Sequence, residues 1–243
     1  MSPDATAPTA PAHVIQGERV AIPVEIRDAA VASAMFPVPA DAAQAVIAYS
    51  GLEVAAPLPG RAICSLAFVR YADGDLGPYH EFAVTFLVKG TAPGERRRIG
   101  AFVHWLPVNQ AFTLEAGRTI WGFPKEMADI RMDLASRIKR CLVRVDGRTV
   151  LEMHVRPGVP VPAGKTAASV DAYTRMDGTT RRTPWSVSPT GVRMRPGGAS
   201  LELGDHPVAH ELRALGLDRA RALSAATVDH VRMIFQDAVE VRP

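Results

Sequence analysis

The strongest constraint on the fold is a succession of short apolar runs, rich in Val, Ile, Phe and Ala, separated by turn residues. Runs of about four to eight residues between Gly, Pro and Asp clusters are typical of β-strands. In this chain they cover 61–71, 81–89, 99–106, 132–134, 140–145 and 149–155. Asp146 and Gly147 join the last two runs, which predicts a hairpin. The middle of the chain is therefore expected to be antiparallel β.

The flanking segments predict a few more elements. Residues 19–26 alternate like a strand, with Pro23 at an edge or bulge. Asp28 is a suitable N-cap for an Ala-rich helix that would run to Phe36, and 45–49 is expected to be a strand. Segment 157–198 is expected to form loops with two strands, 206–216 a short helix, and 227–241 a long final strand. The sum is a mainly β (α+β) fold.

The bulk composition is that of a globular protein. The chain has 243 residues, of which 47% are hydrophobic and 22% charged, and no linker divides it. We expect a flexible tail over 1–15 and one domain over 16–243. No apolar run reaches the roughly 18 residues that a membrane helix needs, and the start lacks a signal-peptide pattern. A cytoplasmic protein that binds no membrane is expected, with Cys64 and Cys141 as reduced, buried thiols.

Several binding functions find little support. The net charge is +3, and the one dense basic run, 96–98, follows a turn, so no nucleic-acid partner is expected. His206, His210 and Glu211 could share a helix face, but their spacing does not fit His-Glu-x-x-His, so no metal site is expected. No Gly-rich phosphate loop or nucleotide motif stands out. We therefore expect no cofactor.

One lysine has unusual neighbours. The chain has 24 arginines but four lysines, and Lys125 follows the apolar residues Ile120, Trp121, Phe123 and Pro124. An ordinary lysine, with a pKa of about 10.4, is neutral in roughly one molecule in 2,500 at pH 7. Burial lowers that pKa and makes the amine a nucleophile toward carbonyls. The alternative is a surface lysine after a proline turn.

The segment from Gly117 to Glu126, GRTIWGFPKE, resembles the Schiff-base motif of the acetoacetate decarboxylase family, in which Lys125 matches the catalytic lysine. The stretch LGPYHE, ending at Glu81, is similar to the family's Leu-Gly-x-Tyr-x-Glu segment. Arg19 is similar in position to the family arginine that holds a substrate carboxylate. A further likeness lies at GASLELGDHP, residues 198–207. The resemblance runs from about residue 19 to 241.

This resemblance implies a single antiparallel sheet curled into a cone or barrel with a few short helices. It also implies that Lys125 forms an iminium with a small keto acid and releases carbon dioxide from a β-keto acid. Glu81 would then move protons with help from Tyr79, and Arg19 would bind the carboxylate. The substrate site would also include Ser65, Trp121 and Phe123. Relatives of this kind form homo-oligomers, so we expect one here.

Two departures from the family pattern leave the reaction open. Glu126 stands where acetoacetate decarboxylase has a second lysine, and Ser65 falls on or beside the position of a further glutamate. If Lys125 and Glu126 lie on a strand, their side chains point to opposite faces. One alternative is an aldolase-dehydratase or cyclase of secondary metabolism that uses the same lysine. Another is a ligand-binding relative that has lost catalysis.

Overall fold

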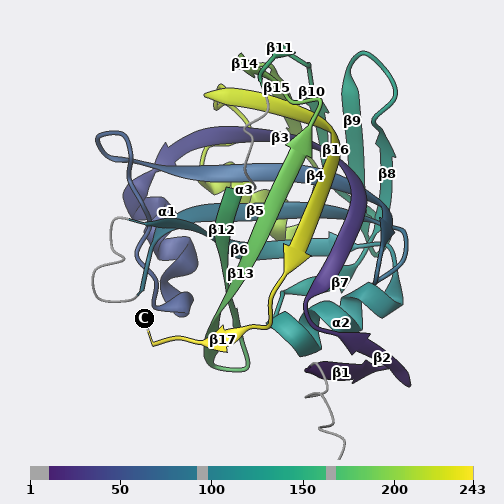
Figure 1. The fold of residues 1–243 in the computed structure, drawn as a ribbon. Helices are drawn as coiled ribbons and strands as arrows, with labels where there is room; N and C mark the ends of the chain where they lie inside the picture. Colours follow the sequence, from purple (N-terminus) through teal and green to yellow (C-terminus); the bar gives the residue numbers. More distant parts are fainter. Residues whose placement is uncertain (1–10, 92–97, 163–167, 243) are drawn as a thin grey trace, which may run out of the picture.

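The structure, a computed structural model, describes residues 11–91, 98–162 and 168–242. In this part of the chain, seven strands close into a barrel, because β16 pairs with both β3 and β13 (Figure 1). In order around the barrel they are β16 (Ser224–Phe235), β3 (Val24–Pro39), β4 (Arg61–Gly74), β5 (Tyr79–Lys89), β6 (Ile99–Val108), β12 (Ala168–Met176) and β13 (Thr179–Thr190). The predicted mainly β barrel is confirmed. Two pairings depart from the antiparallel expectation, since β6 runs parallel both to β12 and to the short strand β7 (Lys125–Met127).

A second sheet of four strands lies against the outside of the barrel. It comprises β15 (Ala199–Leu203), β10 (Arg148–Val155), β9 (Lys139–Val145) and β8 (Asp129–Asp133). Alternate side chains of β3, β4 and β5 point away from the barrel interior and pack with Cys141, Val143 and Met153 in the larger hydrophobic core. The hairpin at Asp146 and Gly147 is confirmed, and both residues have positive φ, 49° and 75°.

Three α-helices and several short elements complete the described fold. They are α1 (Ala40–Ile47), a 3₁₀ turn (Ala48–Ser50), α2 (Ala111–Trp121), α3 (Pro207–Ala214), and the short strands β1 (Ala12–Ile15), β2 (Glu18–Ala21), β7 (Lys125–Met127), β11 (Val159–Pro160), β14 (Arg193–Pro196) and β17 (Val239–Glu240). The predicted helix at 206–216 is confirmed as α3, with Leu212 and Leu215 buried. Figure 1 shows α2 at one end of the barrel, close to β1 and β2.

Two expected elements were wrong: a predicted helix is a strand, and a predicted strand is helical. The Ala-rich segment 28–36 is part of β3, where Ala32, Ala34 and Phe36 are buried in the core. The helix propensity of alanine is overridden because β3 is paired on both sides, with β4 and β16. Residues 45–49, expected as a strand, belong to α1 and the 3₁₀ turn. Their apolar run is short, and such runs do not distinguish a strand from a buried helix.

Other segments differ in extent. The final strand stops at Phe235, and β17 follows separately at Val239–Glu240. In segment 157–198 the described residues, 157–162 and 168–198, form four strands, β11 to β14, where two were expected. Within the expected tail, Ala12–Ile15 pair with β2 as β1, while residues 1–10 lie outside the described part. Most of the basic run 96–98 also lies outside the described residues, so its role stays a prediction. The expectation of a single domain stays a prediction as well.

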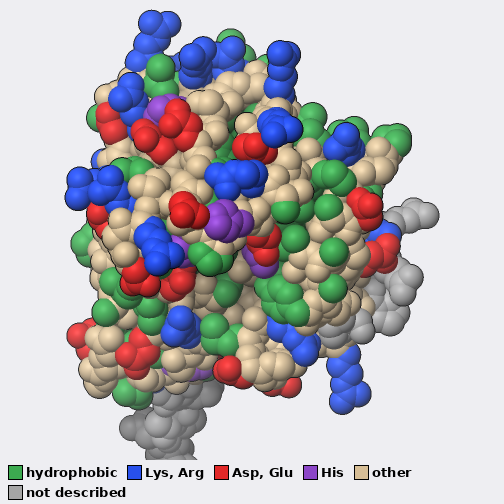
Figure 2. Space-filling view, turned by 180° about the vertical axis from the view of Figure 1, so that it is seen from behind, with side chains coloured by type: hydrophobic (Ala, Val, Ile, Leu, Met, Phe, Trp, Pro, Cys, Tyr) green, Lys and Arg blue, Asp and Glu red, His purple; other side chains and the backbone are tan. Residues whose placement is uncertain are grey.

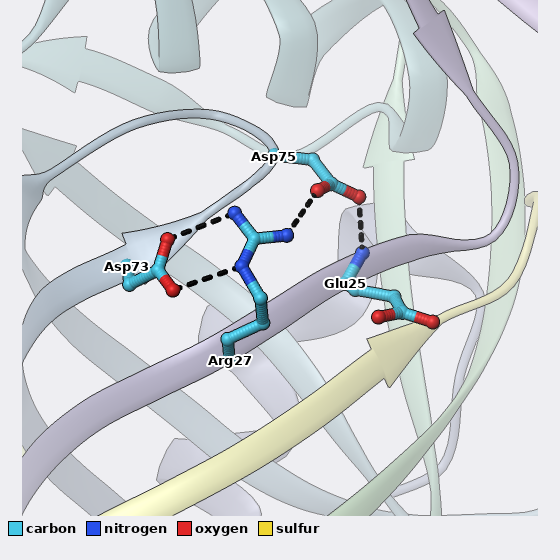
Figure 3. A network of polar contacts seen from close by, with 4 residues as sticks. All are labelled: Glu25, Arg27, Asp73 and Asp75. Carbon is cyan, nitrogen blue, oxygen red and sulfur yellow. Dashed lines mark hydrogen bonds and ion pairs between the residues drawn. The ribbon is translucent and has the colours of Figure 1, made fainter.

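A polar network fixes the turn between β4 and β5. Figure 3 shows Arg27 of β3 with its guanidinium between Asp73 and Asp75, at 2.8 and 2.9 Å from the first carboxylate and 2.6 Å from the second. The backbone N–H of Glu25 also donates to Asp75, at 2.8 Å. These hydrogen bonds hold the turn that leads into Tyr79, the first residue of β5. Arg27 raises the stability of the ionised Asp73, whose pKa is lowered mainly by the hydrogen bond from Arg27.

The surface carries charges of both signs. Figure 2 shows acidic and basic side chains interspersed over one face, with apolar side chains scattered between them. None of the helices in the described ranges has both the length and the apolar character that crossing a membrane would require.

Candidate active site

The candidate site is a cavity inside the barrel that contains Lys125. Lys125 begins β7, which runs parallel to β6 and brings the lysine beside Leu106. The cavity has a volume of about 120 Å³. Most of its wall is apolar, with small aliphatic residues on the barrel strands and an aromatic group formed by Trp121, Phe123, Trp185 and Phe235. Among the described residues that line it, Lys125 and Glu81 are the two that carry charge.

The amine of Lys125 is enclosed by three partners. The side chain is 2% exposed, and its Nζ lies 3.0 Å from Oε2 of Glu81. Nζ also donates a hydrogen bond of 2.9 Å to the Thr113 hydroxyl and lies 4.9 Å from the ring centre of Tyr79. The structure thus brings together three of the residues predicted from the sequence, Lys125, Glu81 and Tyr79.

Two tyrosines support the carboxylate. The Tyr71 hydroxyl donates to Oε1 of Glu81 at 2.8 Å, so both oxygens of Glu81 have partners. The rings of Tyr71 and Tyr79 are stacked, with centroids 4.1 Å apart. The Tyr79 ring in turn lies 4.9 Å from Nζ of Lys125. Five side chains therefore form a connected polar group at one end of an otherwise apolar cavity.

The electrostatics of this group shift the Lys125 amine toward its neutral form. Burial lowers the pKa of Lys125 below its ordinary value, and this effect exceeds the opposing influence of the Glu81 charge and hydrogen bond. Burial also raises the pKa of Tyr71 and of Tyr79 well above their ordinary values, so both phenols stay protonated at neutral pH. The site thus holds a basic nitrogen of reduced pKa next to protonated hydroxyl groups.

The Gly-Arg pair of the motif has a direct structural explanation. A Cβ on Gly117 would lie 2.6 Å from Cδ of Lys125 and 2.7 Å from Cε, so glycine leaves the space in which the lysine stem lies. Arg118 donates through Nε to the backbone carbonyl of Lys125 at 2.8 Å. Gly122 ends α2 in the left-handed conformation, at φ 64°, and the chain then turns back toward Lys125. The helix thus positions the lysine through both its side chain and its backbone.

The start of α2 is tied to the segment that carries Glu81. Gln110 caps the helix, because its side-chain oxygen accepts from the Thr113 N–H at 2.9 Å. The amide nitrogen of Gln110 donates to the carbonyls of Leu76 and Pro78, at 3.2 and 3.4 Å. Since Pro78 directly precedes β5, this one side chain fixes Thr113 relative to Tyr79 and Glu81.

Glu126 lies away from the amine. Its carboxylate accepts a hydrogen bond from the indole N–H of Trp105, whereas Lys125 points into the cavity. Alternation along β7 explains the separation, as expected from the sequence. The charge of Glu126 is not among the influences on the Lys125 pKa. Glu126, which stands in place of the family's second lysine, is therefore directed to Trp105 and away from the amine.

The remaining predicted residues are divided between cavity and periphery. Trp121 and Phe123 line the cavity. Arg19 is exposed on β2, and Ser65 is half-buried on β4 opposite Thr85; neither is among the described residues that form the cavity wall. The roles proposed for Arg19 and Ser65 stay predictions.

The histidines near the C-terminus have structural partners. His206 caps α3, with Nδ1 accepting from the Val208 N–H at 3.3 Å, and His210 pairs with Asp205 at 2.8 Å. Across the described ranges, no group of three or more His, Cys, Asp or Glu side chains could hold a metal ion.

Two residues of the site were missed from the sequence, Thr113 and Tyr71. Thr113 belongs to α2, a helix that was not predicted, although Gly122 at its end is a typical stop signal. Tyr71 was placed in a strand, but its direction depends on the pairing of β4 with β5, where it lies opposite Tyr79. That register could not be derived from the run of apolar residues alone.

Comparisons with known proteins identify the family and agree with the fold. A family model described as acetoacetate decarboxylase (ADC) matches residues 6–239. Acetoacetate decarboxylase from Legionella pneumophila is similar in structure, with a TM-score of 0.67 and 16% identity over 90% of this chain and 87% of that one. An acetoacetate decarboxylase-like enzyme from Sphingomonas wittichii has a TM-score of 0.63 and 15% identity over 96% and 100% of the two chains.

A third similar structure is the enduracididine biosynthesis enzyme MppR, complexed with the condensation product of pyruvate and imidazole 4-carboxaldehyde. Its TM-score is 0.64, with 18% identity over 98% of each chain. At these identities the likeness concerns the fold. No match was found among curated protein sequences.

Proposed function

The chain belongs to the acetoacetate decarboxylase family, and from that premise we propose that Lys125 forms a Schiff base with a small β-keto acid and releases carbon dioxide from it. The observation that carries this proposal is the buried Lys125 amine, enclosed in an apolar cavity with a carboxylate 3.0 Å away. A lysine in such surroundings is a usable nucleophile toward ketones.

The first stage is imine formation. Neutral Lys125 attacks the ketone carbon, a C–N bond forms, and the carbonyl oxygen becomes a hydroxyl after a proton moves from nitrogen. Glu81 lies within reach of Nζ and is suited to carry this proton to the oxygen. A second proton, taken up from solvent, then lets the hydroxyl leave as water. The product is an iminium ion whose positive nitrogen can accept electrons from the neighbouring carbon.

The second stage is loss of carbon dioxide. The bond between the α-carbon and the carboxylate breaks, its electrons form an enamine, and the iminium charge is neutralised. The apolar wall favours this step. It solvates the localised charge of the substrate carboxylate less well than water does, whereas the transition state has that charge spread over more atoms. A proton then returns to the enamine carbon, and water releases the ketone from Lys125.

Acetoacetate tests the reaction directly. The wild-type protein is expected to release carbon dioxide and form acetone, and Lys125→Met is expected to do neither. Lys139→Met is the matched control, since Lys139 is a partly buried lysine of β9 whose amine bonds the Leu134 carbonyl. Absence of carbon dioxide from the wild type with acetoacetate and with longer β-keto acids would argue against decarboxylation.

A second function uses the same lysine. The likeness to MppR complexed with a product of pyruvate and an aldehyde favours an aldolase-dehydratase, in which the enamine attacks an aldehyde and water is then lost. Turnover of pyruvate plus an aromatic aldehyde, without carbon dioxide from acetoacetate, would favour this reaction over the first.

A further inference from the structure

We propose that Thr113 is a positioning residue for the Schiff-base reaction, which holds one hydrogen of the Lys125 amine so that the lone pair of the nitrogen points into the cavity. This inference rests on the proposed function of Lys125. The sequence motif does not include Thr113, which lies on α2, twelve positions before Lys125.

A neutral amine nitrogen has a fixed arrangement of hydrogens and lone pair. Such a nitrogen carries two hydrogens and one lone pair, arranged approximately as a tetrahedron with the Cε bond. Nζ of Lys125 has two oxygen partners, Oε2 of Glu81 at 3.0 Å and Oγ1 of Thr113 at 2.9 Å. When each oxygen accepts one hydrogen, the remaining direction belongs to the lone pair. The lone pair can then point into the cavity that Lys125 lines, where a ketone would bind.

Helix α2 places Thr113 next to the Lys125 amine. Thr113 and Gly117 are four residues apart on α2 and thus lie on the same helical face. Gly117 leaves room for the lysine stem, and Thr113, one turn earlier, meets its nitrogen. Thr113 is fully buried, and the cap from Gln110 to its backbone N–H holds it in place. The acceptor is therefore rigid, as a positioning group must be.

The reaction gives the two hydrogens different fates. One hydrogen must leave nitrogen during imine formation, and Glu81 is the base that can take it to the departing oxygen. The iminium keeps one N–H, and Thr113 remains as its acceptor. The threonine therefore orients the amine before attack and fixes the plane of the iminium afterwards, while no proton is transferred to or from its hydroxyl.

The test compares Thr113→Val, Thr113→Ser and Thr180→Val. Valine keeps the shape of threonine but removes the acceptor, whereas serine keeps the hydroxyl. Thr180 is another buried threonine, and its hydroxyl bonds the Ser50 carbonyl, away from Lys125. Circular dichroism and thermal unfolding establish that each variant is folded.

The probe is 2,4-pentanedione, a 1,3-diketone that condenses with a neutral amine to a stable enaminone and one water. Its attachment is followed by absorbance and intact mass across pH. Thr113→Val is expected to slow attachment about 10- to 100-fold at every pH, including pH values at which the amine is fully neutral. Thr113→Ser is expected to restore most of the rate, and Thr180→Val to react like the wild type.

Two outcomes would overturn the inference. One is an unchanged attachment rate in Thr113→Val; the other is a deficit that disappears at high pH, which would mean that Thr113 affects protonation and not orientation. Failure of the proposed function looks different, since the wild type itself would then form no adduct with the diketone or with keto acids.

Discussion

The Lys125 amine lies between apolar walls that disfavour its charge and a carboxylate that favours it. Burial is the larger influence, so the pKa of Lys125 is below its ordinary value. Glu81 has two effects, because it raises that pKa and also provides the base that imine formation requires. Tyr71 holds the other oxygen of Glu81 and thereby fixes the direction of the carboxylate.

Replacing Glu81 with Gln separates these two effects. Loss of the negative charge leaves desolvation unopposed, so the pKa of Lys125 should fall further. The pH midpoint of diketone attachment should therefore move to lower pH in Glu81→Gln, while turnover of a keto acid falls because the base is gone. A midpoint that moves to higher pH would contradict this account of the electrostatics.

Much of the site could be predicted at the level of single residues. The segment around Lys125 and the Tyr79–Glu81 stretch follow a motif that is local in sequence. Thr113 and Tyr71 could not be found in this way, because their participation depends on the placement of α2 and on the register between β4 and β5. Arg19 is exposed on β2, outside the described residues of the cavity wall, and its role stays a prediction.

At the level of elements, α2 and β7 act as one unit around the lysine. Gly117 and Arg118 of α2 contact the side chain and the backbone of Lys125, and Gln110 ties the helix to the residues before β5. This arrangement explains why a motif of ten residues contains both a helix end and the nucleophile.

Gly117→Ala tests this unit. Alanine favours a helix over glycine by about 1 kcal/mol, but the added Cβ would collide with the Lys125 stem. We expect turnover and diketone attachment to fall about 100-fold through displacement of the amine. The thermal midpoint should change little or fall modestly, since overpacking costs about 1–3 kcal/mol.

The matched control for that change is Glu115→Ala, on the exposed side of the same helix. It should leave both rates unchanged. Wild-type activity in a folded Gly117→Ala protein would show that the glycine is not needed for the position of the lysine.

The elements themselves were predicted unevenly. The hairpin at Asp146 and Gly147 and helix α3 have strong local signals. The alanines of β3 favour a helix locally, and their strand conformation arises only because β4 and β16 pair with both edges. α2 contains Gly117 and two threonines, which weaken its helical pattern, and its stability depends on its cap and on packing at the barrel end.

At the level of the whole molecule, the barrel has two different faces. Large side chains such as Phe68, Phe82 and Phe102 point outward, into the core beneath the second sheet. On the inward face, Ala101 and Ala172, direct partners across β6 and β12, leave space between larger side chains such as Trp185. The cavity thus follows from the distribution of side-chain sizes along alternating strands.

Filling that space should block the site without touching its polar group. Ala101→Leu is expected to exclude keto acids and the diketone and to abolish adduct formation, because the cavity is about 120 Å³. Ala135→Leu, in an exposed turn after β8, adds the same atoms at the surface and should have no effect. A crystal structure or thermal unfolding of Ala101→Leu would establish that the barrel is intact. Undiminished adduct formation in this variant would mean that the reactive cavity lies elsewhere.

Reductive trapping of the wild-type protein shows directly whether Lys125 forms a Schiff base. Borohydride is added in the presence of a panel of β-keto acids and pyruvate, and the protein is then digested and its four lysines are mapped by mass spectrometry. We predict a reduced adduct on Lys125 with at least one keto acid. An absence of adducts across the panel, or their confinement to other lysines, would contradict this prediction.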